Sequence, residues 1–233
     1  MKPVAIFTHT ECEPPGYLVN LLRELEYPFQ LVCLHNGVNT DFKLADFSKL
    51  IFMGGPGNVA EPESWMLQEM AIIRQARQDG IAVLGICLGA QLMSRALGGK
   101  IWQADSLEVG WHEVRLLDAA RDNRWFQGLG ECITVFQWHA HNFSAPPGAT
   151  ALATSECTPC QAFVDGDNLA IQFHLEMTVE IIQTLIEKYG GDLESESDCV
   201  QNREQILQHI EQRCAQTFRI ADHLLMNWLR QTT

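Results

Sequence analysis

Apolar runs of strand length are interleaved with helical segments over the first 100 residues of this 233-residue chain. The runs are PVAIFTH, FQLVCLH, KLIFMGGPG and IAVLGI, and the segments between them are GYLVNLLRELEY and SWMLQEMAIIRQARQDG, whose apolar residues recur at helical spacing. Continuously apolar strands joined by helices are typical of a parallel sheet covered on both faces. The sequence therefore predicts an α/β fold with a mostly parallel sheet flanked by helices.

Residues 100–170 have a different character, because their apolar runs are shorter and more polar. These runs are WHEVRLL, CITVFQW, TALATS and CQAFVDG, and glycine and proline separate them. We expect an antiparallel or mixed extension of the sheet here. The run NLAIQFHLE then predicts a last buried strand, and the chain is expected to be helical from Thr178 to its end.

The carboxy-terminal segment shows a helical stripe of apolar residues between Glu194 and Gln231. Steps of three and four predict one long amphipathic helix or a broken pair, with the stripe formed by Ile206, Ile210, Cys214, Phe218, Ala221, Leu225 and Trp228. We expect residues 1–190 to form one domain and residues 191–233 a helical extension packed on it. The alternative is that the stripe contacts a partner protein, as in a homodimer.

Composition excludes several classes of partner. With 16 Lys plus Arg against 29 Asp plus Glu, the formal charge of −13 disfavours nucleic acid and anionic membrane surfaces. The sequence has neither a secretory apolar segment at its start nor a run of the roughly 18 apolar residues that a membrane helix needs, so we expect a cytoplasmic protein. In that compartment the eight cysteines are expected to be thiols, metal ligands or catalytic groups more often than disulfides.

Cys87 lies where the apolar run AVLGI passes into the helical segment LGAQLMSRAL. A strand, a sharp turn and a helix make a nucleophile elbow, in which Gly85 and Gly89 let the neighbouring backbone approach closely. The first turn of the helix favours a thiolate, because its N–H groups and dipole attract negative charge. The bland alternative is a small buried side chain in a tight turn.

A base for such a nucleophile is available in IQFHLE. Alternate residues of a strand share one face, so Glu176 can reach one ring nitrogen of His174 while the other nitrogen faces Cys87. This requires that the strands carrying residues 81–86 and 169–174 are near neighbours. The alternative is a buried histidine beside a surface carboxylate.

The segment FMGGPGNV follows an earlier predicted strand. Its glycines 54, 55 and 57 leave backbone N–H groups unobstructed, as an oxyanion hole requires. A phosphate-binding loop is disfavoured because no Gly-Lys-Ser/Thr follows.

Together, GICLGAQL, GGPG and QFHLE resemble the class I, or triad-type, glutamine amidotransferases, and within them the amidotransferase part of GMP synthase and its stand-alone relatives. The resemblance implies their flavodoxin-like fold. It also implies that Cys87 is the nucleophile that forms a γ-glutamyl thioester, that His174 is the base and general acid, and that Glu176 orients it. The oxyanion donors would be the backbone N–H groups of Gly55 and Leu88.

The same resemblance predicts the substrate contacts. They are Gly57, Gln91 one helical turn beyond the nucleophile, and His139, Ala140 and His141 in a WHAHNF loop. The chain departs from the family pattern at Ala90, where many relatives have histidine, and at Leu175, which replaces the usual proline; neither change removes a catalytic group. His141 stands where the GMP synthase type often has aspartate, so how the α-amino group of the substrate is held stays open.

The expected function is hydrolysis of a γ-glutamyl amide, releasing glutamate and ammonia without a cofactor. No nucleotide-binding signature is present, so a separate synthetase or acceptor subunit would have to use the ammonia. The alternatives are a stand-alone γ-glutamyl peptidase or hydrolase and a catalytically idle regulatory subunit.

Two further features keep other chemistries open. Cys157 and Cys160 in CTPC could form a zinc site with His139 and His141, but one C-x-x-C pair is a weak signal and no metal is expected. Glu11 and Glu13 follow the first strand, where a related cysteine-elbow superfamily has a glutamate.

Overall fold

The computed structural model describes residues 1–33 and 42–230. Nine strands form one sheet in the order β2-β1-β3-β4-β9-β8-β7-β5-β6. The parallel part comprises β1 (Val4–Phe7), β2 (Phe29–Val32), β3 (Lys49–Phe52), β4 (Ala82–Ile86) and β9 (Asn168–Ile171). The predicted parallel sheet is therefore confirmed. The predicted strand FQLVCLH ends earlier than expected, and its Leu34 and His35 lie outside the described residues.

The middle of the chain extends this sheet with antiparallel strands, as predicted. These are β5 (Ile101–Leu116), β6 (Cys132–Phe143), β7 (Thr150–Thr154) and β8 (Ala162–Asp165), and β8 pairs with β9 at the junction. The register of the β5–β6 pair shifts between Gln103 and Glu108. The short helix α4 (Asp118–Arg121) connects β5 to β6.

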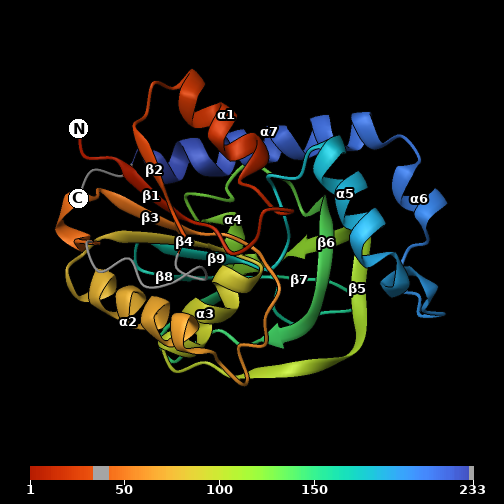
Figure 1. The fold of residues 1–233 in the computed structure, drawn as a ribbon, viewed down its shortest axis with the longest axis horizontal. Helices are drawn as coiled ribbons and strands as arrows, with labels where there is room; N and C mark the ends of the chain where they lie inside the picture. Colours follow the sequence, from red (N-terminus) through yellow and green to blue (C-terminus); the bar gives the residue numbers. More distant parts are fainter. Residues whose placement is uncertain (34–41, 231–233) are drawn as a thin grey trace.

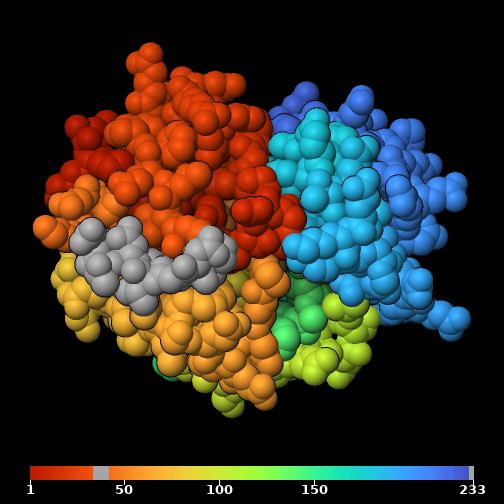
Figure 2. Space-filling model, in the orientation of Figure 1, coloured from red at the N-terminus to blue at the C-terminus, as the bar shows by residue number. Residues whose placement is uncertain are grey.

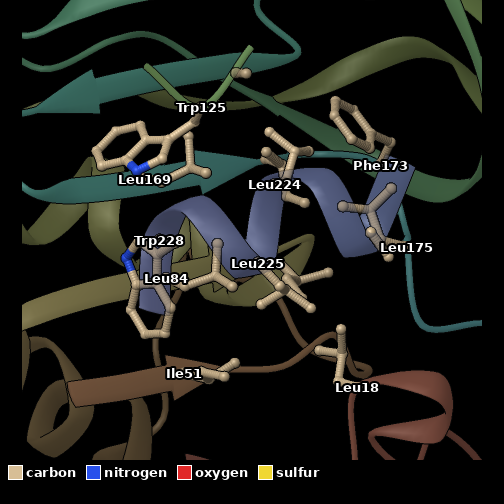
Figure 3. Packing of buried hydrophobic residues seen from close by; sticks show 14 of the residues in the cluster. Leu18, Ile51, Leu84, Trp125, Leu169, Phe173, Leu175, Leu224, Leu225 and Trp228 are labelled. Atoms are coloured by element: carbon tan, nitrogen blue, oxygen red, sulfur yellow. The ribbon is translucent and has the colours of Figure 1, made fainter. Parts of the chain in front are cut away.

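Helices cover both faces of the sheet (Figure 1). On one face lie α1 (Gly16–Glu24) and α7 (Ile210–Leu229), and on the other lie α2 (Ser64–Gln78) and α3 (Leu88–Ala96). Figure 3 shows Leu224, Leu225 and Trp228 of α7 packed over Leu84 and Leu169 of the central strands. Each of these side chains is buried, and full burial of one large apolar side chain contributes roughly 1.5–3 kcal/mol.

The segment after Thr178 was predicted to be helical to its end. It does contain helices, but a non-helical stretch interrupts them. Helix α5 (Val179–Tyr189) begins where the Thr178 hydroxyl accepts a hydrogen bond from the Ile181 N–H, and it runs into the 3-10 turn η2 (Gly190–Glu194). An irregular stretch follows, in which Val200 forms a bridge with Val109 of β5.

The predicted broken pair is α6 (Arg203–Leu207) followed by α7. The pair breaks at His209, whose backbone has a left-handed φ of 56°. Helix α6 begins with a capping box between Asn202 and Gln205. Its first residue, Arg203, lies nine residues after Glu194, the residue from which the apolar stripe was expected to run. None of the helices within residues 1–33 and 42–230 has the length and apolar character that crossing a membrane requires.

Candidate active site

Cys87 lies between the end of β4 and the start of α3. Its backbone has φ 50° and ψ −107°, a combination that residues with a Cβ rarely adopt and that marks a strained turn. The turn leaves no room for a side chain at Gly89, since a Cβ there would lie 2.1 Å from the carbonyl oxygen of Phe52. The predicted elbow is thus formed, with the nucleophile candidate at its apex.

The thiol of Cys87 is buried and faces two groups from other strands. Nε2 of Gln172 lies 3.6 Å from Sγ, and Sγ lies 3.8 Å from the carbonyl oxygen of Trp138. Gln172 immediately follows β9, which pairs with β4 as the sequence argument required. Gln172 was not predicted as a site residue, because an amide side chain at the end of a buried strand has no chemical signature of its own.

His174 and Glu176 form a buried pair. Nδ1 of His174 lies 2.7 Å from Oε1 of Glu176, and the second oxygen of Glu176 accepts the backbone N–H of Leu175 at 2.9 Å. The two residues lie beyond the last residue of β9, not in the strand as predicted. The His174 N–H donates to the carbonyl of Phe136 in β6 instead.

The other ring nitrogen of His174, Nε2, is buried and has no hydrogen-bond partner among the described residues. Burial alone would lower the pKa of His174, but the carboxylate of Glu176 and the adjacent Cys87 outweigh it and raise the pKa well above its usual value. A histidine held this way can accept and return a proton at the thiol.

The Gly54–Gly57 turn leaves β3 beside the elbow. Gly89 N–H donates to the carbonyl of Met53 at 3.1 Å, which joins the turn to α3. Within the described part of the chain, the N–H groups of Gly55 and Leu88 have no hydrogen-bond acceptor. Both residues line the same cavity as Cys87, so the two predicted oxyanion donors are available to a ligand there.

The predicted substrate contacts also line this cavity. They are Gly57, Gln91, His139, Ala140 and His141. Nε2 of Gln91 donates to the carbonyl of His141 at 3.2 Å, so this side chain ties α3 to β6. The WHAHNF segment is not a loop as predicted, since it forms the last half of β6 opposite the register shift in β5.

The cavity has a volume of about 220 Å³ and extends beyond the predicted residues. Its remaining walls include Glu13 in the loop after β1, Trp138 of β6, Leu185 and Tyr189 of α5, and Asp192 of η2. Glu13 was considered from the sequence only for a different chemistry, and neither Glu13 nor Glu11 hydrogen-bonds to Cys87 among the described residues. Leu185, Tyr189 and Asp192 come from the segment after Thr178, for which the sequence predicted helices but no site residues.

The sequence model described as "Glutamine amidotransferase class-I" matches residues 16–189 of the chain. The chain belongs to this family. It is 28% identical over 196 residues to "Putative glutamine amidotransferase-like protein YfeJ" of Salmonella typhimurium, covering 82% of both chains. It is 32% identical over 152 residues to one subunit of the glutamine-hydrolyzing GMP synthase of Sulfurisphaera tokodaii, covering 62% of this chain and 78% of the relative.

Solved structures of glutamine amidotransferases have the same fold. The structure from Methylobacillus flagellatus superposes with a TM-score of 0.92 at 29% identity, covering 99% of this chain and 95% of the other. The one from Thermotoga maritima gives a TM-score of 0.88 at 27% identity, with 98% of each chain covered. The mixed sheet and its flanking helices are therefore those of class I glutamine amidotransferases.

The chain also contains a buried carboxylate, Glu108, behind the cavity. It accepts hydrogen bonds from Nε2 of His139 at 3.0 Å and from three further side chains, Ser155, Thr158 and Gln161, at 2.7–2.9 Å. Burial opposes ionisation, but these donors lower the pKa of Glu108. Nδ1 of His139 is left buried and without a partner among the described residues. In the sequence, Glu108 is the single acidic residue of the otherwise apolar run LEVGW, and this was the one signal that could have marked it as unusual.

Six of the eight cysteines are thiols, as predicted, but the remaining two form a disulfide that was not predicted. Cys157 forms a disulfide with Cys199, and Cys160 lies apart from it with its thiol directed to the carbonyl of Ala162. The C-x-x-C pair therefore forms neither a redox pair nor the zinc site considered with His139 and His141. Ligand atoms of Glu108, His112 and Cys157 lie within 4.8 Å of one another, but the disulfide and the hydrogen bonds to Glu108 occupy two of them.

Proposed function

We propose that this chain hydrolyses a γ-glutamyl amide through a γ-glutamyl thioester on Cys87. One observation supports the proposal above the rest: Cys87, the predicted oxyanion donors and the proposed substrate contacts line one cavity, with the His174–Glu176 pair beside the thiol. A nucleophile, a base and an orienting carboxylate in this order are the components of acyl transfer.

The proposed reaction has two halves. Sγ of Cys87 attacks the amide carbon, and the C–S bond forms as the carbonyl oxygen takes up the negative charge of a tetrahedral intermediate. This intermediate collapses to the thioester when the C–N bond breaks and His174 gives its proton to the departing nitrogen. The N–H groups of Gly55 and Leu88 hold the negative oxygen of each tetrahedral intermediate. Water then adds to the thioester carbon, His174 takes a proton from it, and breakage of the C–S bond releases glutamate and restores the protonated pair.

The test is glutamate release by the purified protein from glutamine and from a panel of γ-glutamyl amides. Wild type is expected to turn over at least one of them, and Cys87→Ala is expected to lose activity by at least about 10⁴-fold. Circular dichroism and the melting temperature of the variant establish that its fold is retained. Full activity of Cys87→Ala would refute the proposal.

A second candidate function is a stand-alone hydrolase of substituted γ-glutamyl amides such as peptides. The cavity favours it, because its walls continue past Cys87 to Leu185, Tyr189 and Asp192 and leave room beyond the amide nitrogen. For glutamine as substrate, the relative from Sulfurisphaera tokodaii, which is one subunit of a GMP synthase, suggests that a separate synthetase protein receives the ammonia. Turnover of glutamine that rises on adding such a protein would support that arrangement over the stand-alone one.

A further inference from the structure

The position of the general acid defines where the amine leaves. The group that protonates the departing nitrogen must lie beside it, so the leaving amine occupies the His174 side of Cys87. The same side is bounded by Gly54, on which a Cβ would lie 2.9 Å from Cε1 of His174 and 3.6 Å from Cβ of Cys87. That Cβ would also lie 3.2 Å from Oε2 of Glu13. The Glu13 carboxylate therefore borders the space that the leaving amine enters.

Glu13 has no hydrogen-bond or ion-pair partner among the described residues, although its side chain is partly buried. Burial raises the pKa of Glu13, and the positive charges of His174, His9 and Lys188 offset this only in part; none of these three residues lines the cavity. An unpaired carboxylate in a partly desolvated site is costly, and a bound cation would relieve that cost.

A second carboxylate continues the same wall. Asp192 of η2 lines the cavity and accepts a hydrogen bond from Nε1 of Trp138 at 2.9 Å through Oδ2, and its Oδ1 accepts none among the described residues. The wall also includes Tyr189, whose ring centre is 6.4 Å from that of Trp138 and whose hydroxyl is 3.8 Å from Sγ of Cys12. Figure 2 shows the red loop after β1 directly beside the cyan segment of α5.

The carboxylates that line the cavity have no Lys or Arg beside them in the described part of its lining. Among the described residues that line it, two carry carboxylates and none is Lys or Arg. The whole chain has a formal charge of −13, which adds a field that attracts cations. Nδ1 of His139, which lines the cavity, is buried without a partner in the described part of the chain, so the cavity also presents a polar atom to a ligand.

We propose that the leaving group is a diamine or polyamine, and that Glu13 and Asp192 hold its free ammonium while its carbon chain packs on Leu185 and Trp138. This inference rests on the proposed γ-glutamyl amide hydrolysis and adds the identity of the amine. Trp138 supplies an aromatic face that also attracts a cation, whereas the ring of Tyr189 already has the Lys188 ammonium over it, 5.2 Å from the ring centre.

Three γ-glutamyl amides of equal chain length test it, those of 1,4-diaminobutane, butylamine and 4-aminobutyric acid. They differ only at the far end of the amine chain, which carries a positive charge, no charge and a negative charge, respectively. We expect wild-type kcat/KM to rank diamine above butylamine by roughly tenfold and the acid below both, because one charge-assisted contact is worth about that factor.

Glu13→Gln and Asp192→Asn keep the size of each side chain and remove the charge. Each is expected to lower kcat/KM for the diamine amide by roughly tenfold while leaving the butylamide within about twofold. Glu11→Gln is the matched control, since Glu11 is an exposed acid of the same loop that does not line the cavity. Dissociation constants of the three amides for Cys87→Ala, measured by calorimetry, give a readout independent of turnover.

The outcomes separate the two proposals. Turnover of the amides without a charge preference, or an equal loss on all three amides in Glu13→Gln, overturns the diamine assignment and leaves γ-glutamyl hydrolysis standing. The second of these results would make Glu13 a positioning residue for His174. Absence of both turnover and binding for every amide, glutamine included, overturns both proposals.

Discussion

Nε2 of His9 lies 2.9 Å from Oε2 of Glu69, and both side chains are fully buried behind the Gly54–Gly57 turn. The other ring nitrogen, Nδ1, lies 3.0 Å from the carbonyl oxygen of Gly54. Helix α2 thereby reaches the turn that carries one proposed oxyanion donor, through a single imidazole ring. A buried histidine that joins a carboxylate to the backbone fixes the position of both.

This pair predicts a pH-dependent stability. Burial lowers the pKa of His9, but the charge and hydrogen bond of Glu69 prevail and the pKa is raised above 6.5. The folded state thus keeps a proton that the unfolded chain loses, so the contribution is complete below about pH 6.5 and is lost as the pH rises through the folded pKa. The free energy of unfolding, measured with denaturant, should therefore differ less between wild type and Glu69→Gln above that pH than below it. A gap that widens there would contradict the assignment.

A methyl group at Gly54 should impair the proposed chemistry. Because it would lie 2.9 Å from Cε1 of His174, the imidazole must move. We expect Gly54→Ala to lower kcat by roughly 100-fold, since a displacement of about 1 Å at a catalytic group has that effect. The control is Gly190→Ala, where a methyl group meets no atom within 4 Å. Near wild-type kcat in Gly54→Ala would refute the placement of His174.

The Glu108 network should be important for stability. Glu108→Gln removes the carboxylate that accepts four hydrogen bonds and presents an amide N–H₂ to groups that donate. We expect a loss of about 3 kcal/mol in the free energy of unfolding, measured with urea. Glu113→Gln, an exposed acid of the same strand, should change it by less than about 0.5 kcal/mol. Equal effects of the two variants would contradict this role.

The disulfide should stabilise the attachment of the carboxy-terminal segment. Cys157 and Cys199 are 42 residues apart, and closing a loop of that length in the unfolded chain is worth roughly 4 kcal/mol. We expect Cys199→Ser to lower the melting temperature by roughly 10 °C and a dithiol reductant to lower that of wild type by the same amount. The reductant should not lower the melting temperature of Cys199→Ser further, because that variant has no bridge to reduce. Cys132→Ser, which removes an exposed free thiol, is the control. A reductant that has no effect on wild type would show that the bridge is absent in solution.

Sequence patterns were informative wherever one local rule dictates the structure. The elbow at Cys87 follows from an apolar run and its glycine turn, whereas the pairing of β4 with β9 was a condition of the sequence argument, which the structure meets. The identity of the strand after which His174 lies was also predictable. Its location beyond Ile171 was not, because the backbone there bonds to Phe136, a contact between residues far apart in the chain.

The remaining parts of the site come from long-range contacts that no periodicity encodes. Glu108 is buried because side chains about 50 residues away converge on it, and Cys157 finds Cys199 rather than the nearby Cys160. Asp192 reaches the cavity only because α5 ends beside β6. A sequence can mark such residues as unusual, as with an acid in an apolar strand, but it does not name their partners.

Asp192 also lies just past residue 189, where the match to the family ends. The residues proposed to form and break the thioester all lie within that match, whereas this part of the amine-facing wall lies outside it. Under the proposed function, a graft of residues 190–194 from another amidotransferase would change which amine departs without altering the nucleophile, the base or the oxyanion donors. Under the two proposals, selection of the acyl group would belong to the common domain, and part of the selection of the amine would belong to a short turn after it.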